Sequence, residues 1–292
     1  MQQSKVSDIN RILITGIGGF IGRALAQSLS AIGYEVWGID YETNVKRQII
    51  STNLLNLNEL IESSKKLPKC SVIIHTAALA HGQKAPNNET VITNNVKITE
   101  NLLEVFSKKI KHILFISSVA VYGEDKRNQP VSVSDNLRPS TDYGKSKLLC
   151  EQLILKSDIN NCTVLRLSSV YDQKHMLDIR KRVFLPGLSS LKLVIKPSPK
   201  YSFTNIDTVV KTVSSIVKNR PNGKNIYNIS DPKVYSQKIL ATWFPGKEIP
   251  IPVIVTKPFY WLTYLLPKIY GYKIRCLYWK LFKSNVYKVN YK

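Results

Sequence analysis

The feature that most constrains this chain is a short apolar run followed at once by glycines. Residues 11–22 have the sequence R-I-L-I-T-G-I-G-G-F-I-G, and a helical pattern continues from Phe20 to Ser30. The apolar residues 12–14 are typical of a buried parallel strand. A strand that ends in glycines and opens into a helix presents bare N–H groups and a positive dipole end to an anion. We therefore predict that this turn binds the pyrophosphate of a dinucleotide and is not a plain structural turn.

Three glycines of this turn, Gly16, Gly19 and Gly22, are spaced G-x-x-G-x-x-G. A Cβ at these positions would hold the pyrophosphate away from the N–H donors or push the helix off the strand. Asp40 stands at the end of the next apolar run, residues 34–39. A carboxylate there accepts hydrogen bonds from a ribose diol and repels a 2′-phosphate, which favours NAD over NADP.

Two observations keep the choice of cofactor open at this point. Lys46 and Arg47 follow closely on Asp40, and their charges suit the 2′-phosphate of NADP. Asp40 also has a simpler alternative role, since an aspartate after a strand often caps the following turn.

The spacing of the apolar segments predicts the fold class. Buried strands are expected at 72–75 and 113–116, with an amphipathic helix at 95–106 between them. Strands that alternate with helices at this spacing indicate an α/β fold, a Rossmann-type doubly wound parallel sheet that binds ligands at the carboxyl ends of its strands. We expect a smaller C-terminal substrate-binding lobe in addition.

A second constellation lies in the segment D-Y-G-K-S-K-L-L-C-E-Q-L-I. Tyr143 and Lys147 stand four residues apart, so both project from one face of a helix. An ammonium beside a phenol favours the phenolate and lowers the tyrosine pKa, which suits a base that takes a proton from a sugar hydroxyl. A Tyr-x-x-x-Lys pair facing solvent is the common alternative. Ser118, at the end of a predicted strand, is placed to bond the same oxygen and favours the catalytic interpretation.

Composition excludes several other classes of function. The chain has 292 residues and is 43% hydrophobic, enough for a large α/β domain with a smaller lobe. Its four cysteines lie far apart and outside any His/Cys cluster, so we predict inert thiols in the cytoplasm and no metal site. A polar N-terminal segment predicts no signal peptide. The net charge of +22 suits an anionic substrate or a lysine-rich solvated surface, but no nucleic-acid-binding motif accompanies it, and we predict no nucleic-acid partner.

The chain resembles the NAD-dependent epimerase/dehydratase family of the extended short-chain dehydrogenase/reductase superfamily, whose members act on nucleotide sugars. The resemblance runs in register over residues 11–171 and more loosely to about 240. It is carried by Thr15 to Gly22, Asp40, His75-Thr76-Ala77-Ala78, Asn95-Val96, Ser117-Ser118, Val121-Tyr122-Gly123, Tyr143-Gly144-Lys145-Ser146-Lys147, Arg166 and Val170-Tyr171.

The resemblance implies a role for each matching position. Tyr143 would be the general base, Ser118 would orient the substrate oxygen, and Lys147 would bind the nicotinamide ribose and lower the tyrosine pKa. Asn95 would support the strands of the active site. The implied cofactor is NAD, and the implied cofactor-binding residues are Gly16, Gly19, Phe20, Ile21, Gly22, Asp40, Ala77, Ala78, Asn95 and Lys147. The predicted substrate-binding residues are Ser118, Tyr143, Ser169 and Lys200.

The chain also departs from the family pattern. Dehydratases of the superfamily carry an Asp-Glu pair just after the catalytic Ser or Thr, where this chain has Val119 and Ala120, so we expect no dehydration. Galactose-type epimerases often have Asn at the position of Ser169. The arginine that normally contacts the nucleotide phosphate is replaced by Tyr201. The diphosphate then needs another cation, and the candidates are Lys200, Arg180, Lys181 and Arg182.

The predicted function is that of an NAD-dependent epimerase acting at C4 of a UDP-hexose or UDP-N-acetylhexosamine, through a 4-keto intermediate, in surface-polysaccharide synthesis. One alternative is a 4-keto reductase or dehydrogenase with net turnover of NAD(P)H. The other is an NAD-binding protein without catalysis. The family often pairs through a helix bundle, so the helices at 95–106 and 143–155 predict a homodimer.

The C-terminal part is irregular and basic. We predict an NAD-binding domain over 1–172 and a substrate-binding lobe over 173–292, partly packed back on that domain. Residues 249–292 contain no Asp or Glu and interleave eight basic residues with aromatic ones. Such a segment suits the headgroup layer of an anionic membrane, which predicts a peripheral contact of a cytoplasmic enzyme through 258–292. Packing of the aromatics in the lobe or at a dimer contact is the alternative.

Overall fold

The computed structural model describes residues 10–41, 48–79, 90–123, 130–184, 187 and 190–291. The chain forms two compact units that interleave along the sequence. Unit 1 consists of Met1–Tyr122, Leu137–Arg166 and Ile206–Tyr227, and unit 2 consists of Gly123–Asn136, Leu167–Asn205 and Asn228–Lys292. The predicted division into an NAD-binding domain (1–172) and a substrate-binding lobe (173–292) assigns ligands to parts of the chain, and it stays a prediction.

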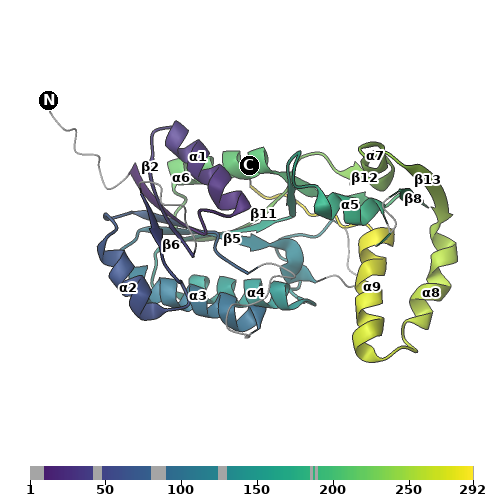
Figure 1. The fold of residues 1–292 in the computed structure, drawn as a ribbon, viewed down its shortest axis with the longest axis horizontal. Helices are drawn as coiled ribbons and strands as arrows, with labels where there is room; N and C mark the ends of the chain where they lie inside the picture. The colour runs from purple at the N-terminus through teal and green to yellow at the C-terminus, as the bar shows by residue number, and fades with distance from the viewer. Residues whose placement is uncertain are drawn as a thin grey trace. The chain divides into compact units, whose positions relative to one another are not determined.

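Unit 1 is built on a seven-stranded sheet with the strand order β11-β6-β5-β4-β1-β2-β3 (Figure 1). The pairs β1–β2, β1–β4, β2–β3 and β4–β5 are parallel. The chain reverses its direction of travel across the sheet between β1 and β4, and ligands of open α/β sheets bind at such a switch point. The strands are β1 (Arg11–Thr15), β2 (Glu35–Asp40), β3 (Ile49–Ser51), β4 (Val72–His75), β5 (His112–Ser118), β6 (Asn161–Leu167) and β11 (Lys224–Ile229).

Helices cover both faces of this sheet, with α1 and α6 packed together on one face and α2, α3 and α4 on the other (Figure 1). This arrangement confirms the predicted doubly wound, Rossmann-type fold. The helices of unit 1 are α1 (Phe20–Ala31), α2 (Leu57–Lys65), α3 (Val91–Phe106), η2 (Val119–Tyr122), α4 (Asp142–Lys156) and α6 (Ile206–Asn219).

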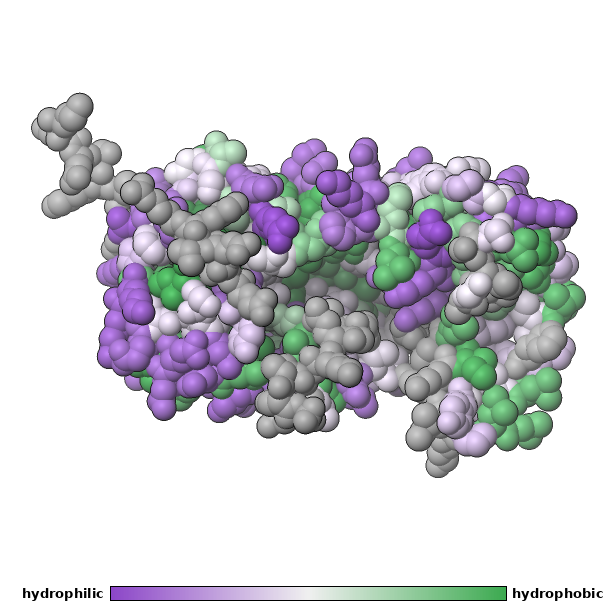
Figure 2. All heavy atoms as spheres, in the orientation of Figure 1, coloured by the Kyte–Doolittle hydropathy of each residue, from purple (hydrophilic) through white to green (hydrophobic). Residues whose placement is uncertain are grey.

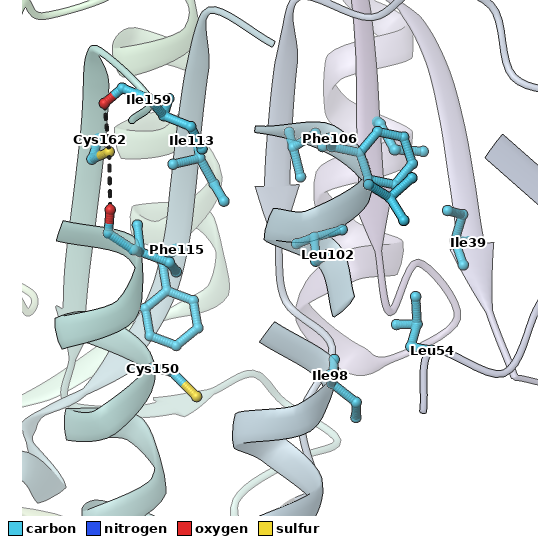
Figure 3. Close-up of a cluster of buried hydrophobic side chains, with 14 of the residues drawn as sticks. Ile39, Leu54, Ile98, Leu102, Phe106, Ile113, Phe115, Cys150, Ile159 and Cys162 are labelled. Atoms are coloured by element: carbon cyan, nitrogen blue, oxygen red, sulfur yellow. Dashed lines mark hydrogen bonds between the residues drawn. The ribbon is translucent and has the colours of Figure 1, made fainter. Parts of the chain in front are cut away.

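A contiguous apolar core holds α3 and α4 to the sheet (Figure 3). The central strand residues Ile73 and Phe115 are almost fully buried, as are Leu102 of α3 and Ile154 of α4. Central strands such as β4 are apolar along their length because helices cover both of their faces. Packing of this kind fixes α4, the helix that carries the predicted catalytic pair, against the sheet.

Unit 2 combines three small two-stranded sheets with short helices around an aromatic core. Its strand pairs are β8–β13 and β7–β10, both parallel, and β9–β12, which is antiparallel. Within the described residues, no helix is long and apolar enough to cross a membrane. The elements are β7 (Ser169–Tyr171), α5 (Leu177–Val183), β8 (Leu191–Lys196), β9 (Lys200–Tyr201), β10 (Phe203–Asn205), β12 (Tyr235–Ser236), α7 (Gln237–Thr242), β13 (Lys247–Pro252), η3 (Val253–Thr256), α8 (Lys257–Leu262) and α9 (Lys268–Phe282).

Candidate active site

The glycine turn between β1 and α1 lies at the switch point of the sheet. Gly16 has a φ of +72°, and its N–H donates to the carbonyl of Ile39 at 2.8 Å. A Cβ on Gly16 would lie 2.8 Å from the Cα of Ala77, which follows β4. A Cβ on Gly22 would collide with the carbonyl oxygen of Gly16. There is therefore no room for a side chain at Gly16 or Gly22, and the backbone of the turn lies against the residues that follow β4.

Asp40, at the end of β2, faces this turn. Its Oδ2 accepts a hydrogen bond from the N–H of Gly18 at 2.7 Å, and its Oδ1 accepts one from Tyr41 at 2.8 Å. The second contact is the turn-capping role foreseen as the alternative, and the first ties the carboxylate to the glycine turn. Lys46 and Arg47 lie outside the described residues.

Asn95 links the segment after β4 to α4, the helix that carries Tyr143 and Lys147. Its Oδ1 accepts from the N–H of Leu79 at 2.7 Å, and its Nδ2 donates to the carbonyl of Leu79 at 3.1 Å. The same Nδ2 donates to Oγ of Ser146 at 3.0 Å, and this hydroxyl donates to the carbonyl of Tyr143 at 2.8 Å. A buried amide thus holds the backbone after Ala77 and Ala78 in register with the first turn of α4.

Lys147 is the least expected charge in unit 1, because its side chain is almost fully buried. Its Nζ donates to the carbonyl of Ile116 at 2.8 Å and lies 4.7 Å from the Phe115 ring centre and 5.8 Å from that of Tyr143. Burial lowers the pKa of this ammonium to about 8, although Cys150 and Glu151 favour its charged form. A lysine held in this way beside a tyrosine is a strong candidate for a functional group.

Ser118 ends β5 and leads into η2, against which α4 packs closely. The Ser118 Oγ accepts from the N–H of Ala120 at 3.2 Å. On α4, Gly144 approaches η2 so closely that a Cβ there would lie 2.6 Å from the carbonyl oxygen of Ala120. Tyr143 precedes this glycine, and so the close packing brings the start of α4 beside the end of the Ser118 strand.

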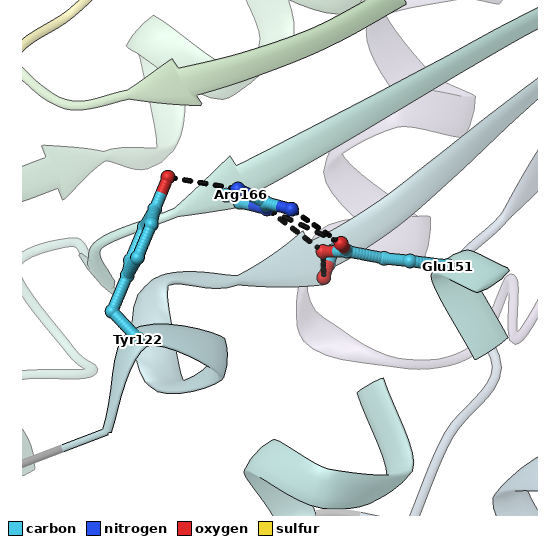
Figure 4. A network of polar contacts seen from close by, with 4 residues as sticks. Tyr122, Glu151 and Arg166 are labelled. Carbon is cyan, nitrogen blue, oxygen red and sulfur yellow. Dashed lines mark hydrogen bonds and ion pairs between the residues drawn. The ribbon is translucent and has the colours of Figure 1, made fainter. Parts of the chain in front are cut away.

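A buried polar network that joins α4, β6 and η2 was not foreseen from the sequence (Figure 4). The guanidinium of Arg166 on β6 makes a paired contact with the carboxylate of Glu151 on α4, with 2.8 Å from Nη2 to Oε2. Its Nη1 also donates to the hydroxyl of Tyr122 at 2.9 Å, and Ser117 Oγ donates to Glu151 at 2.5 Å. The spacing Tyr143, Lys147, Glu151 repeats every four residues, and this was the available signal that Glu151 shares their helix face.

A sequence model of the NAD dependent epimerase/dehydratase family matches residues 12–230. The chain belongs to this family. A UDP-glucose 4-epimerase of Pisum sativum is 30% identical to it over 167 residues, covering 51% of this chain and 47% of that protein. A dTDP-D-glucose 4,6-dehydratase of Dictyostelium discoideum is 28% identical over 255 residues, covering 76% and 58%. The alignments therefore span about half the length of these relatives.

The fold agrees with solved structures of similar architecture. The structure of the UDP-Glc/GlcNAc 4-epimerase from Campylobacter jejuni has a TM-score of 0.69 and 18% identity, covering 83% of this chain and 87% of that one. At this identity the likeness supports the fold alone. The residues that match the family model, 12–230, include the glycine turn, Asn95, Ser118, Tyr143 and Lys147.

The glycine turn fits the cofactor of this family. At Gly16 and Gly22 a Cβ would occupy space already filled by backbone, so the N–H groups of the turn can be approached closely from outside. Gly19, Phe20 and Ile21 form the start of α1, where the helix dipole is positive. The described parts of the chain hold no group of three or more His, Cys, Asp or Glu that suits a metal ion.

Unit 2 holds the two residues that were predicted for substrate binding alone. Ser169 begins β7, and Lys200 is an exposed residue of β9 whose N–H donates to Oγ of Ser284 at 3.0 Å. Tyr201, which replaces the phosphate-binding arginine, is fully buried, and its hydroxyl donates to the carbonyl of Leu281 at 2.9 Å. It is therefore a core residue.

Among the described cations proposed in place of that arginine, Arg182 is the one whose guanidinium lies over the ring of Tyr201. Its guanidinium carbon lies 5.5 Å from the Tyr201 ring centre and 5.0 Å from that of Phe203. Its Nη1 donates to the carbonyl of Asp178 at 2.6 Å. Arg180, on the same helix, stacks on Phe184 instead, at 5.1 Å.

Proposed function

We propose that this protein is an NAD-dependent nucleotide-sugar epimerase that acts at C4 of a UDP-hexose or UDP-N-acetylhexosamine through a 4-keto intermediate. The observation that carries the proposal is the desolvated ammonium of Lys147, 5.8 Å from the Tyr143 ring centre. Burying a charge is costly, and such a group is retained where its electrostatic effect serves chemistry. The names of the relatives, which include a UDP-glucose 4-epimerase, support the substrate class.

In this proposal, the residues of unit 1 move one proton and hold the reacting carbon in place. NAD, when bound, supplies a nicotinamide that accepts the hydride from the sugar carbon and returns it. Tyr143, as phenolate, takes the proton of the C4 hydroxyl and gives it back to the keto oxygen. The Lys147 ammonium stabilises the phenolate, and Ser118 donates a hydrogen bond to the same oxygen. Epimerisation requires that the keto sugar rotates between the two proton transfers, so that it presents its opposite face.

The cofactor would be held by the glycine turn and by residues around it. The N–H groups at the start of α1, at Phe20, Ile21 and Gly22, would receive the pyrophosphate. Gly16 and Gly19, whose N–H groups bond within the turn and to β2, would leave the space for its approach. The Asp40 carboxylate, tied to the turn through Gly18, would accept from the adenosine ribose and favours NAD. Ala77 and Ala78 would line the cofactor bed, and Asn95 holds the backbone directly after them.

Dehydration, the reaction named for one of the relatives, is disfavoured by the residues after Ser118. Val119 and Ala120 form the beginning of η2, where dehydratases of the superfamily carry an acid–base pair. Neither side chain can donate or accept a proton. Elimination of water from the sugar would therefore lack its catalyst on this segment.

The substrate diphosphate requires a cation, since Tyr201 cannot supply one. We favour Arg182, because its guanidinium lies over the ring of the residue that replaces the family's arginine. Its Nε makes no hydrogen bond among the described residues and is shielded from solvent by the surrounding protein. A planar guanidinium suits the paired recognition of phosphate oxygens. Ser169 and Lys200 remain proposed substrate contacts.

The proposal is tested by incubating the purified protein with a panel of UDP-, dTDP- and GDP-sugars and following the products by NMR. A C4 epimer of one UDP-sugar is expected, without stoichiometric consumption of NADH. Consumption of one NADH per product would instead assign a 4-keto reductase. Absence of any turnover with NAD bound would indicate a protein that binds the cofactor without catalysis.

The cellular setting is also a proposal. We propose a cytoplasmic enzyme that supplies sugars for surface polysaccharide and pairs into a homodimer through the helices at 95–106 and 143–155. A peripheral contact with an anionic membrane through residues 258–292 would bring it close to such assembly. The basic and aromatic composition of that segment supports this contact.

A further inference from the structure

A helical hairpin in unit 2 has no part in the proposed chemistry. It comprises η3, α8, the connection after α8 and α9, residues 253–282. Nine exposed large hydrophobic side chains belong to it, and Figure 2 shows the apolar surface that they form over α8 and α9. These side chains are Ile254, Val255, Trp261, Leu262, Tyr264, Leu265, Leu266, Tyr270 and Ile274.

The α8–α9 hairpin is a packed element with one apolar side turned outward. On its inner side, the rings of Tyr260 and Tyr278 lie 4.7 Å apart, and Thr256 Oγ1 donates to the hydroxyl of Tyr278 at 3.2 Å. Near the connection, Arg275 stacks on Tyr264 at 4.5 Å and donates to the carbonyl of Thr263 at 3.2 Å. The exposed side chains are therefore displayed by a defined scaffold, and an exposed apolar patch of this extent marks an interaction site.

The charges around this patch identify the kind of partner. Residues 249–292 carry eight basic side chains and no acidic one. Lys257 opens α8 and is exposed, while Lys280 and Lys283 stand at the end of α9. Trp261 and Leu265 are 68% and 82% exposed. Leucine and tryptophan side chains on a segment whose only charges are positive match the boundary between acyl chains and anionic headgroups.

We propose that the α8–α9 hairpin docks on the surface of an anionic lipid bilayer, with Trp261, Leu265 and Leu266 inserted beneath the headgroups. Lys257 and Lys283, at the ends of the two helices away from their connection, would attract the anionic surface. This sharpens the membrane contact proposed above by naming the residues that enter the lipid. It does not depend on which sugar the enzyme uses.

The experiment measures binding of the full-length protein to sedimented vesicles of phosphatidylcholine, with and without phosphatidylglycerol. Binding is expected only with phosphatidylglycerol and should weaken as salt is added. Trp261→Ser and Leu265→Ser should each lower the partition coefficient about tenfold or more, because each removes a large inserted side chain. Leu177→Ser is the matched control, since Leu177 is 65% exposed on α5, outside the hairpin, and should bind as the unchanged protein does.

Two results would overturn the docking proposal. One is no binding to phosphatidylglycerol vesicles at low salt, or equal binding by the hairpin variants. The other is a protein dimer, measured by sedimentation velocity without lipid, that Leu265→Ser dissociates, since a second copy of the chain would then cover the patch. Circular dichroism and NAD binding of each variant in lipid-free buffer verify folding. Epimerase activity in that buffer is assayed separately, so that failure of the enzymatic proposal is seen independently.

Discussion

The residue on which the chemistry depends most is Lys147, and its environment has a cost for folding. Its ammonium has left water for a site bounded by Phe115 and the carbonyl of Ile116. The lowered pKa, about 8, means that the folded protein holds this proton less tightly than the unfolded chain does. A residue selected for stability alone would not be a buried cation at this point. Placing a positive charge beside Tyr143 therefore lowers the free energy of unfolding.

The lowered pKa of Lys147 predicts that the ligand-free protein and Lys147→Met differ in free energy of unfolding by an amount that depends on pH. Between about pH 8 and pH 10.5 the unfolded chain still holds the lysine proton and the folded protein has released it. Raising the pH through this window therefore favours the folded state of the parent protein. Its free energy of unfolding should rise relative to that of the variant by on the order of 3 kcal/mol. Denaturant titrations across this pH range measure the difference.

The control for this measurement is Lys145→Met on the same helix, where the lysine is exposed. This variant removes a positive charge from α4 without changing a buried site, so a difference that both variants share would not come from the burial of Lys147. A flat difference for Lys147→Met would show that the buried ammonium keeps an ordinary affinity for its proton.

Arg182 yields a second prediction at the scale of a residue. Arg182→Ala should raise the KM for the nucleotide sugar about tenfold or more, because it removes charge-assisted hydrogen bonds to the diphosphate. NAD affinity should stay unchanged. Arg180→Ala, on the same helix but stacked on Phe184, is the matched control and should leave KM near that of the parent. Steady-state kinetics with both variants measure this, and a larger effect at Arg180 would reverse the assignment.

At the scale of elements, the decisive contact is the packing of α4 against η2. It brings the helix that carries Tyr143 and Lys147 beside the end of the strand that carries Ser118. The contact depends on Gly144, which leaves room for the carbonyl oxygen of Ala120. The backbone conformation in the first turn of a helix does not require glycine. Gly144 is therefore explained by the space that its missing side chain leaves for η2.

Gly144→Ala tests this packing. In an exposed helix the change would stabilise the protein by about 1 kcal/mol. Here the added Cβ would lie 2.6 Å from a backbone oxygen and 3.2 Å from the Cβ of Pro139, so α4 must shift. We expect a net loss of unfolding free energy, since overpacking costs about 1–3 kcal/mol, together with a lower kcat.

Thermal unfolding and steady-state kinetics of Gly144→Ala measure both effects. Lys145→Ala, at the next and exposed position, should change stability by no more than about 0.5 kcal/mol. If Gly144→Ala were as stable and as active as the parent, the contact between α4 and η2 would accommodate a Cβ at position 144, and the packing argument would be wrong.

The elements of unit 1 follow closely from local sequence patterns. The strand expected at 72–75 is β4 itself, and the helix expected at 20–30 is α1, Phe20–Ala31. Period and glycine placement suffice here because β4 is buried along its whole length and α1 is buried on one face.

The elements of unit 2 were predicted less completely, for a physical reason. β13 contains Pro250 and Pro252, and prolines normally exclude a segment from a sheet. It nevertheless pairs in parallel with β8 over six residues, as the edge of a two-stranded sheet where missing N–H donors are tolerated. Pairing of this kind depends on contacts distant in sequence, which periodicity does not report.

At the scale of the whole molecule, the predicted fold class is confirmed, and the family to which the chain belongs agrees with the resemblance found in its motifs. The catalytic and cofactor residues remain predictions whose geometry is now specified. Their connections were not accessible from the sequence, because the bonds from Asn95 to Ser146 and from Lys147 to Ile116 cross 51 and 31 positions. Spacing indicated Tyr143 and Lys147, and the resemblance to the family indicated Asn95. The hydrogen bonds that hold these side chains depend on tertiary packing.

The measurement that tests the central claim most directly compares the parent enzyme with Tyr143→Phe, both loaded with NAD. Epimer formation is followed by NMR and NAD binding by calorimetry. We expect NAD affinity to stay unchanged while turnover falls by about 100- to 10,000-fold, the usual contribution of a positioned acid or base. Near-normal turnover by Tyr143→Phe, with NAD bound, would contradict the claim that this phenol carries the proton.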